Sequence, residues 1–276
     1  MTQILNKYSN LTQRVIVALI GGIGLIAAII YSPYTFFLVF FFICMFSMLE
    51  FYKLVGLDGY IPLKSFGTFI GLFLFTSSFL VGMNIVSSTI FFMVVPLGSM
   101  IFFIKLYKKG EKKPFTNIAF TFLGVLYVGL PFALLNLGVI RDGNYSWQII
   151  LGILIMHWAN DSGAYFAGTK FGKTKLFERV SPKKSWEGSI GGTLTTLIVA
   201  FVLGEYFTDL RHWEWLVMSA IVVIAGTYGD LIESLLKRSM EIKDSGTILP
   251  GHGGFLDRFD GLLLSAPFIA AFLRII

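Results

Sequence analysis

Apolar residues fill this chain in long runs rather than in the short alternating patterns of soluble proteins. A helix needs about 20 mostly apolar residues to cross the hydrocarbon core of a bilayer. Nine segments come close to that length: 15–32, 35–52, 65–83, 87–105, 117–138, 148–168, 188–206, 213–236 and 261–275. The pattern predicts an all-α polytopic membrane protein with about nine transmembrane helices, without an internal repeat or a soluble domain.

Composition supports a membrane protein. Of 276 residues, 55% are hydrophobic and 14% are charged, whereas soluble domains carry about 25% charged residues. The only cysteine, Cys44, lies in an apolar run, so an intrachain disulfide is excluded. Lys7 and Arg14 precede the first apolar segment as they would in a signal peptide. Because that segment is long and no clear cleavage site follows, we expect it to stay as the first membrane anchor.

Basic residues gather in alternate connections between the apolar segments. If the N-terminus is cytoplasmic, all 22 except Arg141, Arg211 and Arg274 lie on the cytoplasmic side. Cytoplasmic loops of membrane proteins carry such an excess of Lys and Arg. We therefore predict a multi-pass protein of the cytoplasmic membrane with its N-terminus inside and its C-terminus outside. The net charge of +6 then reflects topology rather than nucleic-acid binding, although the run 105–113 can also attract anionic lipid headgroups.

Two of the apolar segments carry polar and ionisable residues on one helical face. The first face holds His157, Asn160, Asp161 and Tyr165, and the second holds Thr227, Asp230, Glu233, Ser234 and Lys237. Some of these residues have ordinary explanations, because Glu233 and Lys237 fit a surface pair and Asn160 fits an interhelical hydrogen bond. Asp161 and Asp230 are harder to explain, since an ionisable residue inside a membrane segment costs at least about 2.5–3.5 kcal/mol. We expect both carboxylates to face a polar cavity.

A basic loop precedes the seventh apolar segment and reads SPKKSWEG from Ser181. Ser185 can cap a helix that begins near Trp186, and Lys183 and Lys184 come just before it. Exposed amides with two ammonium groups suit an anion. A capped helix whose lysines only set the topology is the alternative.

The most polar stretch of the chain, residues 242–261, leads into the last apolar segment. Glycines surround His252 and allow a tight turn that presents backbone N–H groups to an anion. Asp257 and Asp260 are three residues apart and share one side of a helix. Together with Asp230 they suit Mg²⁺, which binds carboxylates, water and substrate phosphates. Basic residues of the same region complete a candidate phosphate site at the cytoplasmic face: Lys237, Arg238, Lys243 and Arg258.

The same residues resemble the signature of the phosphatidate cytidylyltransferase (CDP-diglyceride synthase) family. From Ser234 to Asp260 the chain reads S-x-x-K-R-x4-K-D-x-G-x-x-L-P-x-H-G-G-F-x-D-R-F-D, and DSGAYFAGTKFG and SPKKSWEG are similar to a second block of the family. The family commonly has threonine at the position of Ser185, which keeps the hydroxyl. The strong resemblance covers residues 157–261.

The resemblance implies the reaction of CTP with phosphatidic acid to give CDP-diacylglycerol and pyrophosphate, in phospholipid biosynthesis. It implies a multi-span enzyme that needs Mg²⁺, with K⁺ as a candidate second cation and a homodimer as a candidate assembly. It assigns the metal to Asp230, Asp257 and Asp260, which with Lys237, Arg238 and His252 form the expected catalytic group. The expected substrate-binding residues are Asp161, Ser181, Lys183, Lys184, Ser185, Ser234, Lys243, Asp244, Gly253, Gly254 and Arg258. For Asp161, a second cation and the orientation of a lysine are both open.

Two other functions are compatible with some of these features. A secondary transporter also buries charged residues, but it would spread them over repeated helices near the midplane. A CTP-dependent nucleotidyltransferase that acts on another lipid phosphate, such as an ether lipid, would have the same headgroup site. In every case we expect residues 1–145 to form the membrane scaffold on the lipid side and residues 146–276 to carry the catalytic site, within one integral membrane unit.

Overall fold

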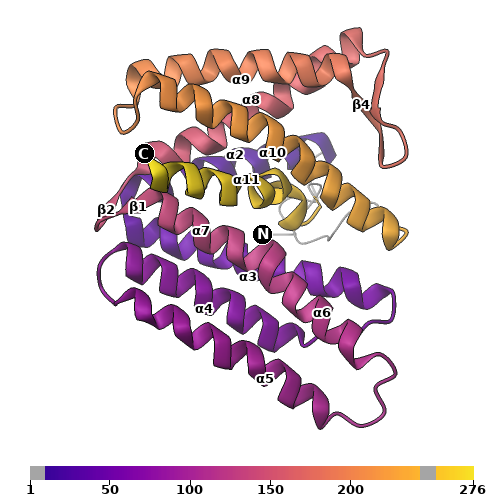
Figure 1. Ribbon diagram of the computed structural model, residues 1–276. Coiled ribbons are helices and arrows are strands. Elements are labelled where there is room, and N and C mark those ends of the chain that lie inside the picture. The colour runs from indigo at the N-terminus through magenta and orange to yellow at the C-terminus, as the bar shows by residue number, and fades with distance from the viewer. Residues whose placement is uncertain (1–9, 243–252) are drawn as a thin grey trace.

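The computed structural model describes the backbone of residues 10–242 and 253–276, and side chains from residue 19 onward in the first helix. Helices form almost all of this part of the chain (Figure 1). In order, the elements are α2 (Asn10–Tyr31), α3 (Pro33–Leu57), α4 (Lys64–Gly82), the 3₁₀ helix η1 (Ser88–Met93), α5 (Val94–Leu106), α6 (Pro114–Gly124), the π-helical segment η2 (Val125–Gly129), α7 (Leu130–Val139), β1 (Ile140–Arg141), β2 (Asn144–Tyr145), α8 (Trp147–Phe171), β3 (Lys175–Phe177), β4 (Ser181–Ser185), α9 (Trp186–Tyr206), α10 (His212–Ser239) and α11 (Leu256–Ile275).

Helix starts follow from local sequence signals. Ser32 caps α3 by accepting a hydrogen bond from the Tyr34 amide at 3.2 Å, and Pro33 stands at the first helical position. Ser185 caps α9 by accepting from the Gly188 amide at 3.2 Å. The predicted cap at Ser185 and the helix start at Trp186 are therefore confirmed.

Each of the nine predicted apolar segments is helical in the structure. Six helical stretches are long and apolar enough to cross a membrane: Pro33–Leu57, Lys64–Gly82, Ser88–Leu106, Pro114–Val139, Trp186–Tyr206 and His212–Ser239. The described apolar part of α2 is shorter, and α8 and α11 carry the polar residues singled out above. The protein is thus an α-helical membrane protein, while the count of nine spans and the orientation of the N-terminus stay predictions.

The helices form two groups with α11 between them. Figure 1 shows α4 and α5 along one side, α9 and α10 along the other, and α11 in the middle. Helix α11 contacts α10 on one flank and α7 and α3 on the other. The motif at the start of α11 is therefore in contact with both halves of the chain.

Aromatic packing joins α11 to the N-terminal group. Phe40 of α3 contacts Phe132 of α7 and Phe259 of α11, with ring centroids 6.3 Å apart in both pairs. Phe132 and Phe259 also pack against each other, with ring centroids 6.1 Å apart. Since each ring buries a large apolar surface, these contacts fix the position of α11 against α3 and α7.

The helical stretch Pro114–Val139 changes its hydrogen-bond pattern at η2. Pro131 has no N–H group, so a regular α-helix could not continue through this point without losing the hydrogen bond to Tyr127. A single π-helical turn accommodates such a gap, and π turns are frequent at functional sites. Tyr127 lies in this turn.

A cluster of polar residues lies where α5 connects to α6, at one end of the N-terminal helix group. Lys105 pairs with Glu111 and donates to the Ile61 carbonyl at 2.6 Å, and both charged side chains are at most 3% exposed. Asn117 donates to Glu111 and accepts from the Ile61 amide at 2.8 Å. Lys105 is therefore not part of the exposed basic loop in which the sequence placed it. We call Lys105, Glu111, Asn117 and the Ile61 backbone the loop clamp.

Two short antiparallel ribbons were not predicted. Strands β1 and β2 join α7 to α8, and β3 pairs with β4 in the basic loop before α9. The second ribbon carries three of the predicted substrate-binding residues, since Lys183, Lys184 and Ser185 lie on β4 and Lys184 reaches Asp230 of α10.

Candidate active site

Helices α10 and α11 approach each other closely at Gly229. A Cβ atom at this position would lie 2.5 Å from the carbonyl oxygen of Asp260, so only glycine fits without a shift of the backbone. Asp230 is the next residue along α10. The close approach therefore brings the side chains of Asp230 and Asp260 to the same place.

Three carboxylates converge at this helix crossing. Asp230, Glu233 and Asp260 each offer an oxygen, and these atoms all lie within 4.8 Å of one another. Glu233 is fully buried. Converging carboxylate oxygens are the donor set that a hard divalent cation prefers, so these three residues fit Mg²⁺. We call them the acidic cluster.

Two lysines reach the acidic cluster from different elements. Lys184 of β4 forms an ion pair with Asp230. Lys237 of α10 pairs with Glu233 and also with Asp257, at 2.8 Å from its Oδ1 atom. The Glu233–Lys237 pair is thus buried within the site, and the simpler explanation of a surface pair is wrong for it.

Asp257 lies in a cradle made by Lys237 and the chain before α11. Its Oδ2 atom accepts a hydrogen bond from the Gly254 amide at 2.8 Å. Gly253 has φ +78° and leaves room for the carboxylate, because a Cβ there would lie 2.7 Å from Oδ2. Asp257 is therefore oriented by a lysine and a backbone amide, whereas Asp260 points to Asp230.

A cavity of about 1790 Å³ opens beside the acidic cluster. Its polar wall contains His157, Asn160, Asp161, Tyr165, Lys183, Lys184, Ser185, Asp230, Lys237, Gly253, Asp257, Arg258 and Asp260. Its apolar wall contains Leu19, Ile20, Ile23, Leu25, Ile26, Val39 and Ile43, from α2 and α3. All four residues predicted on the polar face of α8 line this cavity, together with Thr227, Asp230 and Lys237 of the face predicted on α10, and the part of the lining that α2 and α3 supply is apolar.

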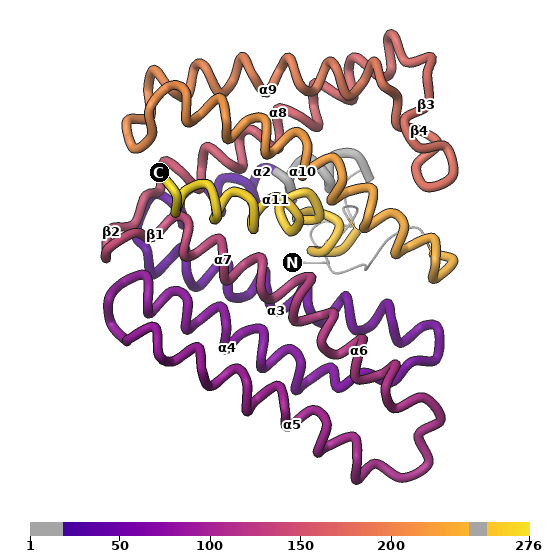
Figure 2. Tube along the Cα trace, in the orientation of Figure 1, coloured from indigo at the N-terminus to yellow at the C-terminus, as the bar shows by residue number. Residues whose placement is uncertain are grey.

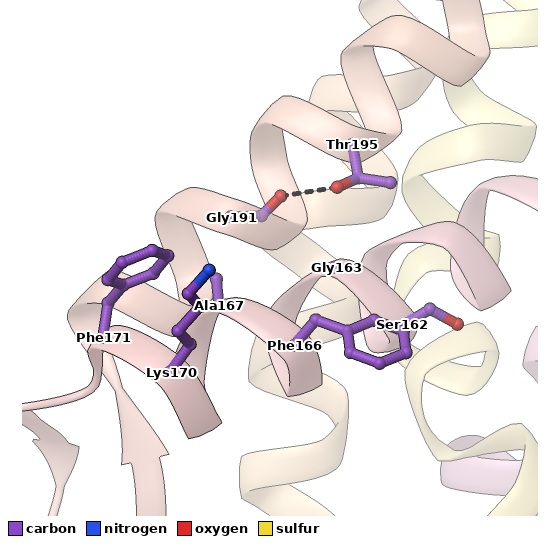
Figure 3. A pocket seen from close by; sticks show the side chains of 8 residues that line it. All are labelled: Ser162, Gly163, Phe166, Ala167, Lys170, Phe171, Gly191 and Thr195. Atoms are coloured by element: carbon purple, nitrogen blue, oxygen red, sulfur yellow. Dashed lines mark hydrogen bonds between the residues drawn. The ribbon is translucent and has the colours of Figure 1, made fainter.

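A second, smaller hollow of about 350 Å³ lies between α8 and α9. Figure 3 shows Phe166, Lys170 and Phe171 beside it, together with the hydrogen bond from Thr195 to the Gly191 carbonyl. No carboxylate lines this hollow, and none of the predicted site residues does.

Most of the predicted site residues that the structure describes meet at this cavity. Within the described chain, four of them do not line the cavity: Ser181, Ser234, Arg238 and Gly254. Ser234 donates a hydrogen bond to Asp230 and the Gly254 amide donates one to Asp257, whereas Arg238 is exposed. Lys243, Asp244 and His252 lie outside the described residues, so their places in the site stay predictions.

Three residues of interest were not among the predicted site residues. Glu233 was noticed on the polar face of α10, but its spacing from Lys237 also fits a surface pair. Glu50 is the only acidic residue of α3, and its position in an apolar segment was a signal that the sequence already offered. The structure shows that Glu50 is 2% exposed. No feature of the sequence singled out Tyr127. Its buried hydroxyl has no hydrogen-bond partner in the described part of the chain and lies within electrostatic reach of all three carboxylates of the acidic cluster.

Comparison with known proteins decides the family. Residues 12–276 match the model of the cytidylyltransferase family. The chain belongs to this family. It is 38% identical over 178 residues to a phosphatidate cytidylyltransferase of Haemophilus influenzae, covering 60% of this chain and 59% of the relative. It is 38% identical over 160 residues to that of Bacillus subtilis (56% and 58% covered), and 41% identical over 165 residues to that of Thermotoga maritima (58% and 60% covered).

The family resemblance seen in the motifs is thereby confirmed. The aligned part of this cytidylyltransferase-family chain spans about three fifths of the length of these relatives.

Proposed function

We propose that this protein transfers the cytidylyl group of CTP to phosphatidic acid, giving CDP-diacylglycerol and pyrophosphate for phospholipid biosynthesis. The observation that carries the proposal is the cavity with two unlike walls. Carboxylates and lysines form one wall, and apolar side chains of α2 and α3 form the other. A lipid phosphate needs both surfaces, because its headgroup is charged and its acyl chains are apolar. Family membership and the names of the relatives support the same reaction.

The transfer needs positioning more than acid–base catalysis. A phosphate oxygen of phosphatidate forms a bond to the α-phosphorus of CTP, and the bond from that phosphorus to the β-phosphate oxygen breaks, so that pyrophosphate leaves with the electron pair. The attacking phosphate is already ionised at neutral pH. The enzyme must therefore hold two polyanions together and stabilise charge on the leaving group. Lys183, Lys184 and Arg258 line the polar wall and neutralise phosphate charge there.

The acidic cluster is proposed to hold Mg²⁺. Bound there, the ion supplies positive charge that offsets the charge of the triphosphate and of the leaving pyrophosphate. Asp230 and Asp260 are two of the three predicted ligands, and the proximity of Glu233 to both supports it as a further one. That Asp257 is a further ligand stays a prediction, as does a second cation such as K⁺. Lys237 keeps Glu233 and Asp257 in place through its two ion pairs.

We further propose nine spans with the N-terminus and the active site on the cytoplasmic side of the cytoplasmic membrane. The connection 58–63, which Lys53 and Lys64 flank, and the basic connections 107–113 and 172–185 lie at one end of the molecule, and the β1–β2 hairpin and the C-terminus lie at the other (Figure 2). This arrangement agrees with the excess of basic residues in cytoplasmic loops. In the proposed orientation, the polar wall faces the compartment that contains CTP.

The alternatives receive less support. A transporter lacks any support from the family, and no feature of the apolar wall distinguishes ester-linked from ether-linked chains. A homodimer stays a prediction.

A direct assay tests the proposal. Purified protein in phosphatidate-containing micelles is incubated with CTP labelled in its cytosine base and with Mg²⁺. We expect a labelled lipid nucleotide and one pyrophosphate for each, and we expect EDTA to abolish both products. Pyrophosphate without a labelled lipid, or a labelled lipid that forms only with an ether-linked substrate, would contradict the proposed function.

A further inference from the structure

Glu50 is a buried carboxylate that belongs to neither wall of the cavity. It lies on α3, in the group of helices that supplies no carboxylate to the cavity lining, and it is 2% exposed. A carboxylate at such a position costs free energy unless a specific contact compensates for it. The contact that Glu50 makes therefore indicates what it does.

The side chain of Glu50 caps α11, although 206 residues separate it from the start of that helix. Its Oε2 atom accepts a hydrogen bond from the amide of Leu256, the first residue of α11, at 2.9 Å. The first amides of a helix have no acceptor within the helix itself. Phe255 stands at the N-cap position and has no side-chain acceptor to offer. Glu50 supplies the missing acceptor, and its carboxylate also interacts favourably with the helix dipole.

An aromatic contact next to this cap also holds the start of α11 against α3. Phe46, one turn before Glu50 on α3, stacks on Phe255 with ring centroids 5.2 Å apart and ring planes at 21°. Phe255 and Leu256 therefore face α3. Asp257 and Asp260 face Lys237 and Asp230 of α10. A rotation or shift of the first turn of α11 would move both aspartates.

We propose that Glu50 is a positioning residue of the active site, which fixes the first turn of α11 so that Asp257 and Asp260 meet their partners on α10. The inference rests on the proposed function for its effect on turnover, but the cap itself is a property of the fold. Glu50 does not line the cavity, and it accepts the first amide of α11 at 2.9 Å. We therefore expect it to act on geometry, so that reach matters more than charge.

Two conservative variants separate reach from charge. Glu50→Gln keeps the length of the side chain and an oxygen acceptor but removes the carboxylate. Glu50→Asp keeps the carboxylate but is shorter by one methylene. Ser47→Ala is the matched control, since Ser47 is fully buried on the same helix and its hydroxyl has no hydrogen-bond partner among the described residues.

Turnover and amide exchange are measured on all four proteins. At saturating CTP, phosphatidate and Mg²⁺, we expect Glu50→Asp to lower kcat by about 10- to 100-fold, because a misplacement of about 1 Å can have that effect. We expect the kcat of Glu50→Gln and of Ser47→Ala to stay within about threefold of that of the unchanged protein. For Glu50→Gln the reason is that one acceptor oxygen suffices for the hydrogen bond to the Leu256 amide. Hydrogen exchange at residues 256–260 should be faster in Glu50→Asp alone.

Several results would overturn the inference. They are equal losses of kcat in Glu50→Asp and Glu50→Gln, unchanged kcat in Glu50→Asp, or faster exchange at the start of α11 in Glu50→Gln. If Glu50→Asp does not fold, the inference is tested by Glu50→Gln alone, through its kcat and its hydrogen exchange at the start of α11. If the unchanged protein makes no CDP-diacylglycerol, the proposed function fails, while the exchange experiment still tests the cap.

Discussion

Two of the charged clusters that lie in the described part of the chain are built differently. In the loop clamp, one lysine meets one glutamate, the Asn117 amide also donates to that glutamate, and the lysine also donates to the Ile61 carbonyl. At the crossing of α10 and α11, Asp230, Glu233, Asp257 and Asp260 share only two described ion-pair partners, Lys184 and Lys237. The loop clamp is balanced within itself, whereas the second cluster concentrates negative charge.

The difference separates a structural role from a functional one. Removing one partner of a buried ion pair leaves an uncompensated charge and costs stability. Carboxylates that crowd together repel one another, and a divalent cation relieves that repulsion. We therefore expect substitutions in the loop clamp to reduce stability without changing the chemistry. We expect substitutions in the acidic cluster to abolish the chemistry at little cost in stability.

The largest effect on activity is expected for Asp260→Asn. The change keeps the shape of the side chain but removes one of the three converging carboxylates, and we expect kcat to fall about 100-fold or more, as it does when a main source of transition-state stabilisation is lost. The unfolding temperature should stay the same or rise, because a repulsion is removed. Steady-state kinetics with increasing Mg²⁺ and a thermal unfolding scan measure the two effects.

Asp142→Asn is the control for this change, since Asp142 lies in the β1–β2 turn at the other end of the molecule. Normal turnover of Asp260→Asn at high Mg²⁺ would show that the acidic cluster is not the catalytic one.

The reverse pattern is expected for Lys105→Met in the loop clamp. Glu111 would lose its buried partner, and the free energy of unfolding should fall by about 3–5 kcal/mol. The double variant Lys105→Met/Glu111→Gln should recover part of this loss, because no buried charge is left alone. Turnover per folded molecule should be unchanged in both variants. A selective fall in kcat would mean that the loop clamp contributes to the site and would undo the comparison.

The sequence predicted the helices well because long apolar runs in a bilayer have few other structures open to them. It also placed Asp257 and Asp260 on one side of a helix. It could not say which of them meets Asp230, since this depends on the approach of α10 to α11 at Gly229. The cap that Glu50 provides was beyond reach for the same reason, because its partner is 206 residues away.

A moderate effect on turnover is expected for Tyr127→Phe. The hydroxyl lies near the acidic cluster and has no partner in the described part of the chain. We expect it to donate a hydrogen bond to a carboxylate or phosphate once the substrates are bound, and its removal should lower kcat about tenfold, the usual effect of one hydrogen bond to a charged group. The unfolding temperature should not change. A variant with full kcat would show that the hydroxyl is a bystander and that the site draws no side chain from η2.

The smallest effect concerns the pH dependence of the loop clamp. Burial alone would raise the pKa of Glu111, but its hydrogen bonds with Lys105 and Asn117 and the charge of Lys105 hold that pKa below its ordinary value of 4.5. A carboxyl with a lowered pKa stabilises the fold fully above its ordinary pKa, and this stabilisation is lost as the pH falls through the lower value. Unfolding temperatures of the unchanged protein and of Glu111→Gln should therefore run parallel from pH 7 to pH 5 and converge below that. The convergence should be smaller than the effect of Lys105→Met, since protonation leaves the shape and the hydrogen bonds with Asn117 in place. Curves that stay parallel down to pH 3 would mean that the charge of Glu111 adds nothing, and the balance that distinguishes the loop clamp from the acidic cluster would be a matter of shape alone.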